Sequence, residues 1–145
     1  METVLFEISS RSAIETEKAG AALAESLTPG DFVALYGDLG AGKTAFVRGM
    51  AAVLAPDAPV HSPTYTIVNE YPAEGGQVFR HLDLYRITGE EDLFSIGYYD
   101  FIGEGFLAAE WCERIPYALP DRYIRVTLEK TGENERKITA CRVES

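Results

Sequence analysis

The chain has 145 residues, 46% of them hydrophobic, which suits one domain with a substantial core, so residues 1–145 are expected to form a single domain. Its formal net charge of −10 would repel phosphate backbones, which argues against independent binding to DNA or RNA. The sequence has no basic and apolar leader and no apolar run of membrane-spanning length, and Cys112 and Cys141 lack metal or redox spacing, so a cytoplasmic location away from membranes is expected.

The N-terminal residues predict an edge strand followed by a helix. Residues 3–8 alternate loosely between apolar and other side chains, as a strand at a sheet edge does. Ser12 and Glu15 have capping-box spacing, which predicts a helix that opens there and stops at Pro29-Gly30. Four apolar residues of this helix are expected to face the core: Ile14, Ala22, Leu23 and Leu27. The helix would then cover one face of a sheet.

Residues 37–44 match the phosphate-binding loop pattern G-x-x-x-x-G-K-[ST] at every fixed position. Glycines allow successive backbone N–H groups to turn toward a phosphate, which a Cβ would obstruct. The lysine adds a positive charge for the terminal phosphates, and the threonine hydroxyl coordinates Mg²⁺. The expected nucleotide-binding residues of this Walker A loop are Gly37, Asp38, Leu39, Gly40, Ala41, Gly42, Lys43 and Thr44.

The flanks of the loop strengthen this interpretation. Residues 32–36 form an apolar run typical of a buried parallel strand. Phe46, Met50 and Leu54 recur on one face of a predicted helix that Pro56 ends. A strand, a glycine loop and a helix in this order aim the helix N-terminus at a phosphate. The sequence therefore predicts a nucleotide-binding protein.

The middle of the chain predicts a loop and two strands. Ser62-Pro63 is expected in the loop, and residues 64–71 and 78–87 are expected to form a hairpin-like pair of strands. In phosphate-loop NTPases, a threonine between the first helix and the next strand often reaches Mg²⁺ and the γ-phosphate. Thr64 has that position, although a threonine that opens a strand is also commonplace.

Two carboxylates compete for the metal and for the attacking water. Asp83 lies in an apolar strand that charged residues interrupt, so it is either a magnesium-shell carboxylate or a structural residue paired with His81 or Arg86. Glu110 ends the apolar strand at residues 105–111, and ligands of open α/β sheets bind beyond the carboxyl ends of strands. We rank Glu110 slightly ahead because its strand is more thoroughly apolar.

The remaining elements complete the predicted fold. Residues 88–91 have capping-box spacing and would open a short acidic helix ending near Ile96, and the aromatic residues 98–101 are assigned to core packing. Residues 122–129 and 136–143 predict a closing hairpin. The expected fold class is α/β: a P-loop NTPase-like domain with a central, mainly parallel sheet, helices on both faces and a C-terminal β-hairpin.

Several of these motifs, taken together, resemble the TsaE family (YjeE-like ATPases). They are the loop at 37–44, Ser62-Pro63-Thr64-Tyr65 with Glu70-Tyr71, His81-Leu82-Asp83-Leu84-Tyr85-Arg86, and Glu110-Trp111. The resemblance implies a small bacterial phosphate-loop ATPase that binds ATP and ADP with Mg²⁺ and hydrolyses ATP weakly alone. It also implies work with the TsaD and TsaB proteins in making N6-threonylcarbamoyladenosine at position 37 of tRNAs that read ANN codons, with tRNA contacted only through those partners.

The resemblance also implies roles for individual residues. Lys43 and the loop backbone would bind phosphates, Thr44 and Glu110 would hold Mg²⁺, and Asp83 would belong to the Walker B-like strand. Lys43, Glu110 and Asp83 are thus the expected catalytic residues. The remaining expected site residues are Ser62 and Thr64 in a switch-like loop, Trp111 packed beside the nucleotide, and Ser12 and Arg136 near the adenine.

Two other functions remain open at this stage. A small-molecule or nucleoside kinase would need an acceptor pocket and usually a mobile lid, and the chain shows no arginine-rich lid segment. A GTPase switch would normally carry an [N/T]-K-x-D stretch, and no lysine here has an aspartate two residues later. The sequence identifies no arginine finger, so slow intrinsic hydrolysis with activation by a partner is predicted.

Overall fold

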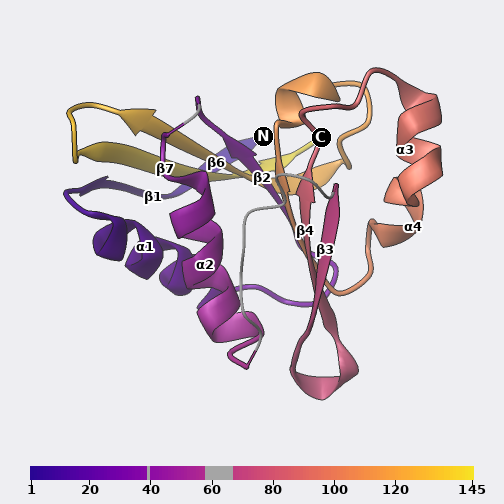
Figure 1. The fold of residues 1–145 in the computed structure, drawn as a ribbon, viewed down its shortest axis with the longest axis horizontal. Coiled ribbons are helices and arrows are strands. Elements are labelled where there is room, and N and C mark those ends of the chain that lie inside the picture. Colours follow the sequence, from indigo (N-terminus) through magenta and orange to yellow (C-terminus); the bar gives the residue numbers. More distant parts are fainter. Residues whose placement is uncertain (39, 58–66) are drawn as a thin grey trace.

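Seven strands of the described residues form one sheet in the computed structural model, which describes residues 1–38, 40–57 and 67–145 (Figure 1). In chain order the strands are β1 (Glu2–Ser10), β2 (Phe32–Tyr36), β3 (Val68–Pro72), β4 (Val78–Asp83), β5 (Phe106–Glu110), β6 (Arg122–Lys130) and β7 (Arg136–Glu144). The helices are α1 (Ala13–Glu25), α2 (Lys43–Leu54), α3 (Glu90–Ile96) and α4 (Tyr98–Phe101), with 3₁₀ turns η1 (Glu74–Gly76) and η2 (Cys112–Arg114).

The centre of the sheet is parallel and its two edges are antiparallel. The strand order is β1-β7-β6-β2-β5-β4-β3, in which β6, β2, β5 and β4 pair in parallel. Strand β3 adds antiparallel to β4, and β7 and β1 extend the other side. Val33, Ala34 and Leu35 of β2 are fully buried, as expected for a strand covered on both faces. The predicted fold class is confirmed, including the edge strand and the closing hairpin.

Helices cover both faces of this sheet. Figure 1 shows α1 and α2 on one side and α3 and α4 on the other. The first pair packs very closely because both helices present glycine at their contact: a Cβ on Gly49 would lie 1.8 Å from the Glu17 carbonyl oxygen. A Cβ on Gly20 would lie 2.0 Å from the Phe46 carbonyl oxygen. None of the helices in the described residues is long and apolar enough to span a membrane.

The predicted cap of α1 is present, but the prediction of its buried face is partly wrong. The Ser12 hydroxyl oxygen accepts the Glu15 backbone N–H at 3.1 Å. Ile14 is 63% exposed and Ala22 is exposed, whereas Leu23 is buried. The buried stripe consists of Thr16, Ala19, Gly20, Leu23 and Ala24. Apart from Leu23, which was predicted, these side chains are small because α2 comes so near, so the pattern of large apolar residues revealed only part of the stripe.

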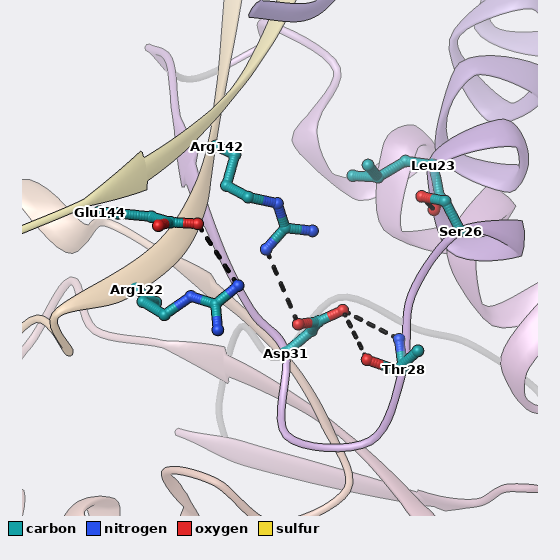
Figure 2. A network of polar contacts seen from close by, with 7 residues as sticks. All are labelled: Leu23, Ser26, Thr28, Asp31, Arg122, Arg142 and Glu144. Atoms are coloured by element: carbon teal, nitrogen blue, oxygen red, sulfur yellow. Dashed lines mark hydrogen bonds and ion pairs between the residues drawn. The ribbon is translucent and has the colours of Figure 1, made fainter. Parts of the chain in front are cut away.

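The turn from α1 into β2 is fixed by polar contacts, drawn in Figure 2. The Ser26 hydroxyl donates to the Leu23 carbonyl oxygen at 2.8 Å, which closes α1. The Asp31 carboxylate accepts the Thr28 backbone N–H at 2.9 Å and lies 4.0 Å from the Arg142 guanidinium of β7. These contacts tie the entry of β2 to the C-terminal hairpin.

Two boundaries in the second half of the chain differ from prediction. Strand β4 ends at Asp83 instead of residue 87, because the Asp83 carboxylate accepts the Tyr85 backbone N–H at 3.0 Å and turns the chain. The capping box predicted for Thr88 and Glu91 does not form at the start of α3. The Thr88 backbone N–H and hydroxyl both donate to the Asp92 carboxylate instead. The hairpin of β3 and β4 is confirmed over the residues that the structure describes.

Candidate functional site

The phosphate-type loop leaves the carboxyl end of β2 and leads directly into α2. Gly37 has φ 152°, and a Cβ there would lie 2.7 Å from the Leu128 carbonyl oxygen, so the start of the loop needs glycine. Gly42 has φ 100° and is the N-cap residue of α2, whose first residue is Lys43. The free backbone N–H groups of a helix N-terminus therefore lie at the loop, as an anion site requires.

Lys43 is the charged residue most clearly suited to an anion. The residue is only 5% exposed, and Nζ has no hydrogen-bond partner among the residues that the structure describes. The ammonium lies over the ring of Trp111, whose centroid is 4.1 Å from Nζ. A buried ammonium without an acceptor is costly, so its chemistry fits a phosphate that enters the loop. Thr44 follows it on α2 and is half-buried.

Trp111 lies beside Lys43, and its expected place next to the nucleotide stays a prediction. It has φ 65°, and it is the only residue other than glycine with a left-handed backbone in the described part of the chain. The Tyr85 ring packs edge-on against it with centroids 4.9 Å apart. Backbone strain of this kind is typical of functional sites. The strained turn directly after β5 places the indole ring over the lysine ammonium.

The two candidate carboxylates lie at neighbouring strand ends. In the parallel pairing of β4 with β5, Asp83 is opposite Glu110, and Glu110 is also opposite Leu35 at the end of β2. The carboxylates therefore meet at the same sheet edge from which the loop departs. His81 Nε2 lies 2.5 Å from Glu110 Oε2, so His81 pairs with Glu110 and not with Asp83. The alternative of a structural His81–Asp83 pair is wrong.

Burial raises the pKa of Asp83 above its usual range, and the negative charge of Glu110 adds to this effect. The Tyr85 backbone N–H, His81 and Lys43 act in the opposite direction. Among the described residues, no group of three or more His, Cys, Asp or Glu side chains is arranged to hold a metal alone. Mg²⁺ usually takes one or two protein carboxylates and completes its shell with substrate phosphates and water, so the neighbouring carboxylates Asp83 and Glu110 suit its chemistry.

The side chain of Arg136 contacts the backbone of the phosphate-type loop. Nη2 donates to the Gly40 carbonyl oxygen at 2.8 Å. Nη1 lies 2.9–3.2 Å from the carbonyl oxygens of the β6–β7 turn, at Gly132, Glu133 and Glu135. Arg136 thus holds the hairpin turn against the loop, which the sequence did not indicate because backbone acceptors leave no pattern.

The other predicted site residues divide into two groups. The Ser12 hydroxyl caps α1, and a role near adenine stays a prediction for Ser12 and for Arg136. Leu39 and the switch-like residues Ser62 and Thr64 lie outside the described residues. Sequence reasoning also missed Thr16, whose side-chain methyl would lie 3.5 Å from a Cβ on Gly42 and whose hydroxyl bonds the Ser10 hydroxyl at 2.7 Å.

The chain is similar to a known protein family, to several of its members and to a solved structure. The family model described as threonylcarbamoyl adenosine biosynthesis protein TsaE matches residues 10–138, a range that contains all the predicted site residues. A tRNA threonylcarbamoyladenosine biosynthesis protein TsaE from Bacillus subtilis is 38% identical over 125 residues, covering 86% of this chain and 78% of the relative. The protein of the same description from Aquifex aeolicus is 38% identical over 143 residues, covering 96% of this chain and 98% of the relative. The crystal structure of YdiB from Bacillus subtilis matches with a TM-score of 0.78 at 31% identity, covering 99% of this chain and 88% of that chain.

Proposed function

This chain belongs to the TsaE family of tRNA threonylcarbamoyladenosine biosynthesis proteins, and we propose that it serves that tRNA modification as a magnesium-dependent ATPase. The observation that carries the proposal is the buried Lys43 ammonium. It lacks a hydrogen-bond acceptor among the described residues, and Lys43 lies at the N-terminus of α2. ATP supplies the missing acceptors as phosphate oxygens, and ADP retains them after hydrolysis.

The loop at residues 37–44 binds the phosphates in this proposal. Backbone N–H groups of the loop and of the α2 N-terminus donate to the phosphate oxygens, while Lys43 adds its charge to the terminal phosphates. Arg136 donates to the Gly40 carbonyl oxygen and so supports the loop shape. The contacts of Ser12 and Arg136 with adenine belong to the proposal as its least supported part.

Thr44 and Glu110 would hold Mg²⁺, with Asp83 as the second carboxylate beside them. The ion, when bound, supplies positive charge that neutralises the terminal phosphates. Support comes from the register that places both carboxylates at the sheet edge where the loop begins. Ser62 and Thr64 are proposed to belong to the switch-like loop that responds to the γ-phosphate.

Hydrolysis in this site is an attack by water on the γ-phosphorus. A bond forms between the water oxygen and phosphorus, and the bond from phosphorus to the β–γ bridging oxygen breaks, with its electron pair leaving on ADP. Asp83 and Glu110 are the described carboxylates that can orient the water and accept its proton. Lys43 stabilises the charge that develops on the phosphate oxygens.

TsaD and TsaB are the proposed partners, and tRNA is contacted only through them. The net charge of −10 supports this division, because the acidic chain is unsuited to holding tRNA itself. Two arginines, one that contacts the loop and one that follows the Asp83 strand, also support partner activation. Arg136 is bonded to backbone carbonyls, and Arg86 is exposed. Slow hydrolysis alone and faster hydrolysis with the partners are therefore expected.

The test is ATP hydrolysis by the protein alone and after addition of TsaD and TsaB, for the parent and for Lys43→Ala. Stimulation is expected for the parent, and the variant should lose at least about a hundredfold in rate because its transition-state charge is no longer neutralised. Lys18→Ala removes the same charge from an exposed position on α1 and should behave like the parent. Hydrolysis retained by Lys43→Ala, or a fast rate that ignores the partners, would contradict the proposal.

A further inference from the structure

The pair formed by His81 and Glu110 is the most deeply buried ionisable contact in the described part of the chain. The side chain of His81 is fully buried and that of Glu110 is 9% exposed. Their atoms Nε2 and Oε2 are 2.5 Å apart, which is a short hydrogen bond. A carboxylate only accepts hydrogen bonds, so the ring nitrogen Nε2 carries the proton.

Beyond Nε2, the His81 ring makes no hydrogen bond to the residues that the structure describes. Nδ1 is buried and has no hydrogen-bond partner among the described residues. The polar function of His81 is therefore directed at one atom, Glu110 Oε2.

The sheet register explains how this contact is built. On β4, His81 and Asp83 are two residues apart and so point to the same face of the sheet. In the parallel pairing with β5, Asp83 is opposite Glu110 and His81 is opposite Ala108. The small side chain of Ala108 leaves room for Glu110 to reach back along its strand to the histidine.

We propose that His81 is a positioning residue for Glu110: it holds Oε2 and leaves Oε1 as the oxygen available to Mg²⁺. This inference rests on the proposed function, in which Glu110 is a metal carboxylate. A ligand carboxylate held by a hydrogen bond to one oxygen loses the freedom to turn away from the ion. Such supporting contacts typically change metal affinity by about 10- to 100-fold when they are removed.

Two amide variants test this role and control for each other. The Gln amide in His81→Gln places a donor close to the position of Nε2, whereas the Asn amide in His81→Asn reaches only the position of Nδ1. Mg²⁺ is titrated into the ADP-saturated protein, and its affinity is followed by calorimetry. We expect His81→Asn to weaken Mg²⁺ binding by about tenfold or more and His81→Gln to retain most of the parent affinity.

The affinity for ADP without Mg²⁺ separates positioning from damage to the fold. Both variants should bind ADP as the parent does, because His81 is assigned no contact with the phosphates. A loss of ADP binding that matches the loss of Mg²⁺ binding would overturn the proposal in favour of a structural role. Unchanged or tighter Mg²⁺ binding in a folded His81→Asn would overturn it as well, and His81→Gln serves as the decisive variant if His81→Asn does not fold.

A double-mutant cycle with Glu110→Gln identifies the route of the effect. If His81 acts through Glu110, His81→Asn should add little to the loss caused by Glu110→Gln. Independent, additive losses would overturn the proposal. If Glu110→Gln leaves Mg²⁺ affinity unchanged, the metal role of Glu110 fails and the positioning role fails with it. Nucleotide binding and hydrolysis, measured separately with Lys43→Ala, show whether the proposed ATPase survives that result.

Discussion

The two faces of the sheet are covered in different ways (Figure 1). On the face that carries the loop, α1 and α2 have 13 and 12 residues and approach each other until backbone meets backbone at Gly20 and Gly49. On the opposite face, α3 and α4 have only 7 and 4 residues. Phe94 of α3 is 67% exposed, and the centroid of its ring lies 5.0 Å from that of the exposed Tyr99.

This difference separates support of the site from cover of the core. The helix that presents Lys43 is fixed against its neighbour by close backbone contact, so the loop has a rigid base. The short helices of the other face bury Leu93 and Tyr98 but leave much of their own surface open. The comparison predicts that changes on the loop face affect stability most, while changes on the other face leave nucleotide binding intact.

The largest effect is expected from Gly49→Ala. The added methyl would lie 1.8 Å from the Glu17 carbonyl oxygen, so α1 and α2 must move apart. We expect the free energy of unfolding to fall by at least about 3 kcal/mol, measured by denaturant titration. Gly89→Ala on the opposite face is the control, because its methyl would have no atom within 4 Å. Similar losses for the two variants would break the comparison.

A smaller effect is expected from Tyr98→Phe. The Tyr98 hydroxyl donates to the Ala118 carbonyl oxygen at 2.8 Å within the core of the second face. Its removal should lower the free energy of unfolding by about 1 kcal/mol. ADP affinity, measured by calorimetry, should not change, because α4 lies across the sheet from the loop. A weaker ADP affinity in a folded Tyr98→Phe would show that the two faces are coupled.

Local sequence patterns were enough to predict the loop and its flanking elements. Strand β2 has the predicted bounds and helix α2 ends before Pro56 as predicted, because an apolar run, a glycine loop and a 3.6-residue period are all encoded by neighbouring residues. The buried face of α1 was only partly predicted. Its contact with α2 depends on Ala and Gly, which patterns of large apolar residues do not reveal.

The contacts inside the candidate site required the tertiary structure. His81 and Glu110 are 29 residues apart in the chain and meet only through the parallel register of β4 and β5. Arg136 reaches Gly40 across 96 residues and uses a backbone acceptor. The sequence identified the carboxylates and the lysine by type and position, whereas their partners follow from strand pairing.

The smallest effects are expected from two aspartates, one at the loop side and one on α3, with opposite dependence on pH. Burial and Glu110 raise the pKa of Asp83 above 3.8 in the folded protein. Between the pKa of the unfolded chain and this raised value, the folded protein holds a proton that the unfolded chain releases. The free energy of unfolding therefore falls as the pH rises through this interval. Asp83→Asn should therefore gain stability over the parent between pH 4 and pH 7.

Hydrogen bonds from Thr88 lower the pKa of Asp92. The contribution of Asp92 to the free energy of unfolding is therefore present above pH 3.8 and is lost as the pH falls through the lowered value. Asp92→Asn should be less stable than the parent at pH 7, with the difference disappearing only in acid. Unfolding curves of the parent and the two variants from pH 3 to pH 7 measure how each substitution changes the free energy of unfolding. If both substitutions changed it in the same direction, the environments of the two carboxylates would not differ as the two faces do.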